Sequence, residues 1–174
     1  MLEERMMLPR TATWTGYDKK RAATDAAFLE GLSLAKQGHF KKAFHKFQIS
    51  HRNGNLDATY TLGTWHREGW LGKLSSTVSA FRYYKQAAVL SHKLGIFGLA
   101  LSYSDGIGVK QSKENALRWY ETGGGKGDVH CMYNAAIIHL NKDQIIKARA
   151  WLKKASDLHY KPANTLLMKI DQES

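Results

Sequence analysis

The sequence predicts an all-α solenoid of about four helix-turn-helix repeats, closed by a C-terminal capping helix. The nine residues that begin at Ala80 (AFRYYKQAA) return 36 residues later at Ala116 (ALRWYETGG) and, less closely, at Ala148. The interior contains no proline between Pro9 and Pro162, so helices can run without the lost donor and the steric clash that proline brings. Repeats of this length are typical of stacked helix pairs.

A second motif precedes each of these segments and has the same period. Its aromatic residues are Tyr60, Phe97 and Tyr133, spaced 37 and 36 residues apart, and Phe28 extends the series backwards. Four units with a period near 36 therefore cover about residues 22–160. One helix pair cannot bury its apolar face alone, so the units must stack on one another.

Each unit is expected to contain two helices, because small and apolar residues recur at intervals of three and four. In the second unit they are Ala80, Tyr83, Tyr84, Ala87 and Ala88, which share one helical face. The expected helices are 22–37, 40–52, 56–68, 76–91, 94–105, 113–123, 128–140, 144–157 and 161–170. The last has no partner and accepts a proline in its first turn, which suits a capping helix.

The third unit carries the motifs of a known family. Residues 99–110 (LALSYSDGIGVK), followed by ALRWY at 116–120, resemble the Sel1-like repeat: a small-residue first helix, a Gly-x-Gly loop and an Ala-x-x-Trp/Tyr-Tyr second helix. The second unit is similar, with GWLG at 69–72 in its loop. The resemblance implies a right-handed superhelix.

The outer units have shorter turns. The spacing from Gly31 to Ala43 and from Ala136 to Ala148 is 12 residues, against 17 and 16 in the second and third units. The short spacing resembles the tetratricopeptide repeat, so the repeat domain, placed at 22–174, looks like two Sel1-like units flanked by two tetratricopeptide-like ones. By resemblance such arrays are adaptors and assembly platforms.

Residues 1–21 do not fit the repeat and are expected to form an extended N-terminal arm. The segment is more apolar than a tail that stays in solvent, because it contains Met7, Leu8, Trp14 and Tyr17. The arm is expected to pack either on its own solenoid or on a partner.

First helices of tetratricopeptide-like arrays line the concave face, where extended ligands bind. The partner-binding residues expected there are Asp57, Tyr60, Arg67, Ser104, His130, Tyr133 and Asn141. Exposed Tyr and Arg are typical interface anchors. The alternative for Tyr60, Phe97 and Tyr133 is a place in the core between repeats.

The chain is strongly basic, with a formal charge of +11 and a pI near 9.7. Such a field attracts acidic proteins, nucleic acid or anionic membrane, although it also serves solubility. A basic patch is expected on the convex second helices, from Lys41, Lys42, Lys46, Arg52, Lys147, Arg149, Lys153 and Lys154. The alternative is an ordinary solvated face.

No motif for catalysis, a cofactor or a metal is found. The eight histidines form no His-Glu-x-x-His pair, and most are expected at the surface; His66 and His139 align with Tyr103 and are expected to be partly buried. GGGKG at 123–127 lacks the first glycine and the Ser or Thr of a phosphate loop, so it is interpreted as a helix end. Asp105 and Asp128 are isolated carboxylates, without a paired acid for acid–base catalysis.

The sequence therefore favours a non-enzymatic scaffold, a structural or assembly subunit of a larger complex, organellar complexes included. One alternative is an RNA- or ribosome-associated protein, supported by the charge and by residues 128–134, which resemble the opening of a pentatricopeptide unit. Another is a bacterial immunity or regulatory adaptor that binds an acidic partner. A single cysteine, Cys131, and the lack of an apolar run of about 18 residues predict an intracellular protein of the cytoplasm or mitochondrial matrix, with peripheral membrane contact left open.

Overall fold

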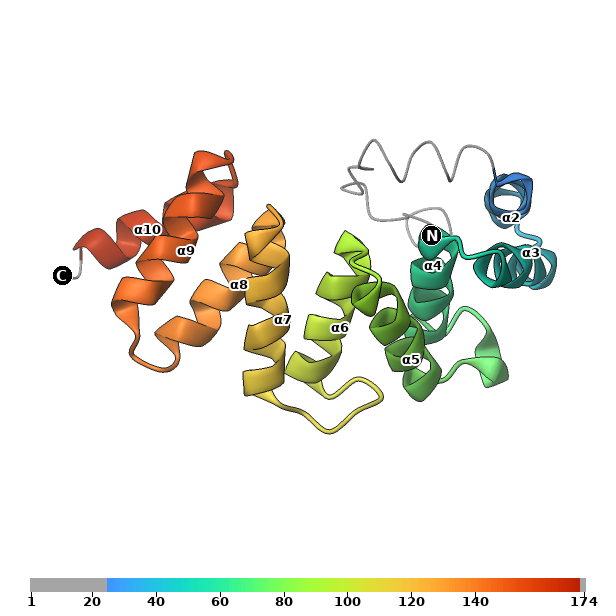
Figure 1. Ribbon diagram of the computed structural model, residues 1–174, viewed down its shortest axis with the longest axis horizontal. Helices are drawn as coiled ribbons and strands as arrows, with labels where there is room; N and C mark the ends of the chain where they lie inside the picture. The colour runs from blue at the N-terminus through green and yellow to red at the C-terminus, as the bar shows by residue number, and fades with distance from the viewer. Residues whose placement is uncertain (1–24, 173–174) are drawn as a thin grey trace.

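The computed structural model describes residues 25–172, which form a row of antiparallel helices without strands in that range (Figure 1). The helices are α2 (Ala26–Lys36), α3 (Phe40–Arg52), α4 (Leu56–Arg67), α5 (Thr77–Val89), α6 (Lys93–Asp105), α7 (Lys113–Gly125), α8 (Val129–Leu140), α9 (Ile145–Asp157) and α10 (Lys161–Gln172), with a short 3-10 helix η2 (Gly72–Leu74). The all-α solenoid was predicted, and the predicted helix boundaries agree with the observed ones to within a few residues.

Consecutive helices pack on one another from α2 to α10, so each unit is a helix pair: α2–α3, α4–α5, α6–α7 and α8–α9. In Figure 1 the turns within the last three pairs lie along the lower edge of the molecule. The first helices α4 and α6 also contact each other directly. Phe97 of α6 likewise meets His130 of α8, so these first helices share one side of the row; the first helices are called the inner helices and the second helices the outer helices.

Polar N-caps define where the first helices begin. Asp25, Asn55, His92 and Asp128 occupy equivalent positions, and each side chain accepts a hydrogen bond from the backbone N–H three residues on. Asp25 also accepts from the Ser50 hydroxyl (2.5 Å) and from the Asn55 amide (3.1 Å). Burial acts to raise the pKa of Asp25, but these hydrogen bonds outweigh it and hold the pKa below 3.8.

The core of each unit is a large side chain of the second helix packed against a small residue of the first. Phe47 lies against Gly31, where an added Cβ would be 2.6 Å from the ring. Tyr84 lies between Gly63 of its own unit and Gly98 of the next, with corresponding distances of 2.8 and 2.7 Å. Without a Cβ at these positions, neighbouring helices can approach closely enough to enclose the rings.

The turns of the second and third units are longer because they make contacts of their own. The α4–α5 turn brings Trp70 onto Trp65 (ring centroids 5.5 Å apart) and onto Phe40 (6.5 Å). In the α6–α7 turn, Gly108 has φ +71° and lies so close to Thr77 that a Cβ would be 2.0 Å from its carbonyl oxygen. The long turns therefore fill space against neighbouring elements.

The C-terminal helix α10 covers the open side of α9, as expected for a capping helix. Ala163 is fully buried, and Leu166, Leu167 and Ile170 pack onto the cluster formed by α8 and α9. Met168 remains 57% exposed on the other side of the helix.

Replacing Gly98 by Ala should lower the free energy of unfolding by about 1–3 kcal/mol, because the new Cβ overlaps the Tyr84 ring. Gly125 is the matched control, since it ends α7 with no atom within 4 Å of an added Cβ. Gly125→Ala should be neutral or slightly stabilising. Urea denaturation of both variants measures the difference, and equal stabilities would contradict the close packing.

Candidate binding surface on the inner face

The residues predicted for the concave face come from the inner helices α4, α6 and α8. Their side chains contribute to two clusters of aromatic and polar groups, and Tyr160, just before α10, completes the second. The first cluster is built around Asp57, Tyr60 and His92, and the second around Phe97, His130, Tyr133 and Tyr160.

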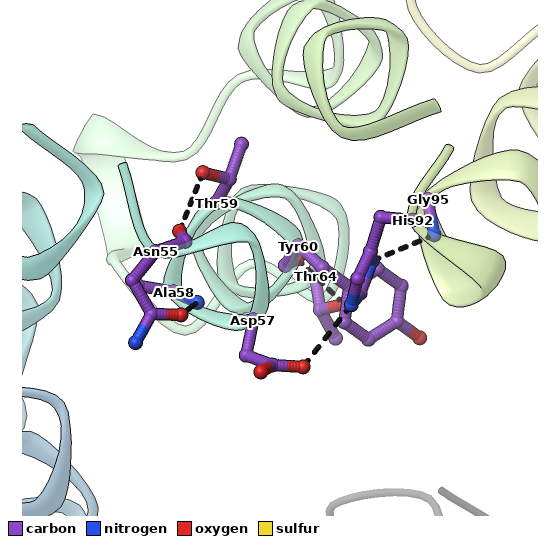
Figure 2. Close-up of polar contacts among 8 residues, drawn as sticks. All are labelled: Asn55, Asp57, Ala58, Thr59, Tyr60, Thr64, His92 and Gly95. Atoms are coloured by element: carbon purple, nitrogen blue, oxygen red, sulfur yellow. Dashed lines mark hydrogen bonds and ion pairs between the residues drawn. The ribbon is translucent and has the colours of Figure 1, made fainter. Parts of the chain in front are cut away.

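The first cluster is held by His92, the N-cap of α6 (Figure 2). Its Nδ1 accepts a hydrogen bond from the Gly95 amide (3.2 Å), so Nε2 carries the proton and donates to Asp57 Oδ1 (3.0 Å). The Tyr60 ring lies 5.8 Å from the imidazole and 5.7 Å from the Tyr84 ring, between centroids. One histidine thus orients a carboxylate and supports an aromatic ring on the preceding unit.

Polar contacts extend this cluster toward the end of α4. The Tyr84 hydroxyl donates to Thr64 Oγ1 (3.2 Å), and Thr64 in turn donates to the Tyr60 carbonyl (3.2 Å). Burial raises the pKa of Tyr84 to about 12, which keeps the phenol protonated as a donor. Arg67 pairs with Glu68 (2.6 Å) and keeps about a quarter of its side chain exposed (27%).

The second cluster consists of half-buried rings. His130 lies 5.1 Å from Tyr160 and 6.1 Å from Phe97, and Tyr133 lies 5.7 Å from Tyr160, between centroids. His130 and Tyr133 come from α8, Phe97 from α6, and Tyr160 immediately precedes α10. The third unit, the fourth unit and the turn before the capping helix therefore share one partly exposed aromatic surface.

The other predicted inner residues lie at its margins. Ser104, near the end of α6, accepts hydrogen bonds from Lys113 through its carbonyl (2.9 Å) and its hydroxyl (3.1 Å). Asn141 is exposed at the C-terminal end of α8. Asp57 is almost completely covered and already bonded to His92, so little of its surface is free.

His92 and Tyr160 were not predicted for this surface. His92 could have been found from its alignment with the N-caps Asn55 and Asp128, 37 and 36 residues away. Tyr160 has no such signal, because the aromatic residue enters the surface from a turn before the unpaired helix α10.

The expectation that most histidines lie at the surface was wrong. Five of the eight are buried or half-buried: His66, His92 and His139 are buried, whereas His51 and His130 are half-buried. Each is kept inside by a partner from another helix. His139, for example, binds Glu121 (3.0 Å) through Nε2 and Gln144 (2.7 Å) through Nδ1. The predicted partial burial of His66 and His139 was confirmed.

The predicted basic residues do not form one patch by themselves, because they divide between α3 and α9 at opposite ends of the row (Figure 1). Three have partners: Lys46 pairs with Glu30 (2.6 Å), Arg149 pairs with Asp171, and Lys154 lies 4.5 Å from the Trp151 ring centroid. Lys41, Lys42, Arg52, Lys147 and Lys153 are exposed. The predicted arm residues Met7, Leu8, Trp14 and Tyr17 lie outside the described residues.

Among residues 25–172, no three His, Cys, Asp or Glu side chains come together in a group that could hold a metal ion. Cys131 is fully buried against Gly123, and burial raises its thiol pKa, which disfavours a reactive thiolate. No helix in that range is long and apolar enough to span a membrane. The arrangement on the inner face is suited to binding through ring surfaces and fixed hydrogen-bonding groups.

The family model of the Sel1 repeat matches residues 56–92, 94–128 and 129–160, which are the second, third and fourth units. The chain belongs to the Sel1 repeat family. The fourth unit is included although its short turn resembles a tetratricopeptide repeat, so turn length does not separate the two kinds of unit here. Sel1 repeat proteins generally act as non-enzymatic scaffolds for protein–protein interaction.

Known Sel1 repeat structures have the same architecture. The crystal structure of a protective antigen from uropathogenic Escherichia coli, with an SLR fold, superposes with a TM-score of 0.70 at 25% identity, over 87% of this chain and 34% of that one. A Sel1 repeat protein from Oxalobacter formigenes gives a TM-score of 0.71 at 20% identity, over 81% of this chain and 57% of that one.

A curated relative is chitin synthase regulatory factor 3 of Schizosaccharomyces pombe, 29% identical over 104 residues. The match covers 57% of this chain and 11% of the relative. The chain thus spans about a tenth of the length of that protein.

His66 should make the folded protein sensitive to mild acid. Its ring packs between Phe44 and Tyr83, its Nδ1 has no hydrogen-bond partner, and burial lowers its pKa from 6.5. Below pH 6.5 the unfolded chain therefore binds a proton that the folded chain resists, so stability falls as the pH drops toward the folded pKa.

His66→Phe removes this titration, and its stability relative to the wild type should be higher at pH 5.5 than at pH 8. Denaturant unfolding at both pH values measures the effect. A dependence of stability on pH that is the same in His66→Phe as in the wild type would refute the assignment.

Proposed function

We propose that this Sel1 repeat chain is a protein-interaction scaffold that holds a segment of a partner protein on its inner face. The observation that carries the proposal is the partly exposed row of rings at Tyr60, Phe97, His130, Tyr133 and Tyr160 across three consecutive units. Rigid aromatic side chains bury a large area at low entropic cost, which makes them typical interface anchors.

Charge on this face supports a protein segment over a polyanion. The inner helices α4, α6 and α8 contain two basic residues, Arg67 and Lys93, and two acidic residues, Asp57 and Asp105. A partner that buries the rings gains mainly from apolar contact, which salt screens little. Binding at this face should therefore persist at about 0.5 M salt.

The curated relative is named as a regulatory factor, and regulation through a bound partner is consistent with a scaffold. We propose that this chain contributes an adaptor to a larger assembly, in which the partner binds across successive units. The half-buried pair of His130 and Tyr133 on α8 lies at the centre of the second cluster and is the best point for a test.

A photo-crosslinking amino acid placed at Tyr133 tests which face binds. In native lysate at about 0.5 M salt and with RNase, it should capture a discrete protein. The same amino acid at Arg118, exposed on the outer helix α7, is the matched control and should not capture it. Capture only from Arg118, or capture lost with RNase, would contradict the inner-face scaffold and favour the outer face or RNA.

His130→Ala and Tyr133→Ala should each weaken binding of that captured partner by about tenfold, the usual effect of truncating an anchor residue. Arg118→Ala should leave the affinity unchanged. Circular dichroism of each variant separates lost binding from lost folding. Unchanged affinity in both folded inner-face variants would overturn the proposal.

A further inference from the structure

The charge of the chain is divided unequally between the two faces of the solenoid. The outer helices α3, α5, α7 and α9 carry the basic residues Lys41, Lys42, Lys46, Arg52, Arg82, Lys85, Lys113, Arg118, Lys147, Arg149, Lys153 and Lys154. Their acidic residues are Glu114, Glu121 and Asp157. The inner helices α4, α6 and α8 are balanced, so the outer face accounts for most of the positive charge.

Arg82, Lys85 and Arg118 join the two groups of basic residues that lie apart on α3 and α9. All three are exposed on α5 and α7, the helices between those ends. Each of the outer helices α3, α5, α7 and α9, which follow one another along the row in Figure 1, therefore carries exposed basic residues. Glu121 is bound to His139 and neutralises none of them directly.

Large aliphatic side chains are exposed on these same helices. Val78 in the first turn of α5 is 56% exposed, Val89 at the end of that helix is 65% exposed, and Ile146 in the first turn of α9 is 86% exposed. Val78 and Ile146 occupy equivalent positions in their units. Lys147 and Lys153 are exposed on the same helix as Ile146.

We propose that the outer face is a docking surface for an anionic membrane. Lysines beside an acidic bilayer each contribute to attraction, and exposed aliphatic side chains enter the boundary between headgroups and acyl chains. The contacts are spread over four helices, which suits a fluid surface that needs no single fixed geometry. The proposed contact is a peripheral one, and no helix of residues 25–172 is long and apolar enough to cross the bilayer.

The kind of exposed side chain favours lipid over single-stranded nucleic acid. Single-stranded nucleic acid is held by exposed aromatic platforms combined with cations. On the outer helices the exposed aromatic residue is Phe40, at 38%, and its ring packs on Trp65 and Trp70. Protruding Val and Ile side chains have no role against phosphates, whereas they add affinity for lipid.

Flotation of the full chain with vesicles tests the proposal. Vesicles of phosphatidylcholine with about 30% phosphatidylserine should bind at about 0.1 M salt, and vesicles of phosphatidylcholine alone should not. The double variant Lys147→Glu/Lys153→Glu should lose at least about tenfold in partitioning. Ile146→Gln should also reduce partitioning, although it leaves the charge unchanged.

Two matched controls separate the outer face from net charge and from general hydrophobicity. Lys73→Glu/Lys110→Glu makes the same charge change in exposed residues of the within-unit turns, and Leu74→Gln removes a 71% exposed leucine from such a turn. Both should bind vesicles nearly as the wild type does. Equal losses of vesicle partitioning in the test and control variants would overturn the proposal of an outer docking surface.

Failure to bind acidic vesicles would overturn it as well. If a single-stranded RNA of about 20 nucleotides bound instead, with affinity that fell steeply with salt, the outer face would be a nucleic-acid surface. Neither result affects the inner-face proposal, since the variants tested here lie on outer helices and turns.

Discussion

The first three units depend on one repeated contact, a large ring of the second helix packed against a glycine or alanine of the first, and Leu152 takes the place of the ring in the fourth unit. Phe47 against Gly31 makes this contact in the first unit, and Tyr84 between Gly63 and Gly98 makes it in the second and joins the third. Tyr120 packs in the same cluster as Ala100. Because each ring is enclosed by two units, no unit is complete alone, and the row must be assembled to bury its core.

Close helix packing also decides the character of the two faces. On the inner side the successive first helices converge, so rings and N-cap groups of neighbouring units meet, as His92 does with Asp57 and Tyr60. On the outer side the second helices leave long cationic side chains and several aliphatic ones in solvent. The two surfaces therefore offer different chemistry: a nearly neutral aromatic face and a basic face.

Much of the candidate surface follows from the repeat period. Tyr60, Phe97 and Tyr133, spaced 37 and 36 residues apart, lie on α4, α6 and α8 and each packs against a core cluster while staying partly exposed. Tyr160 was not predicted, because it lies in the turn before α10, where the repeat of 36–37 residues no longer holds. The burial of His92 was not predicted either, because its partner Asp57 lies 35 positions away along the chain.

By itself the sequence determined the helix boundaries, the number of units and the pairing of small with large residues, because these depend on local periodicity and on a repeat length that shows directly in the chain. Only the tertiary structure decided which polar groups are bonded and which are free. Asp57 is hydrogen-bonded to His92. The basic residues of α5 and α7 lie between those of α3 and α9 in the order of the helices. Those outcomes depend on side chains that meet across units, where spacing along the chain carries no information on contact.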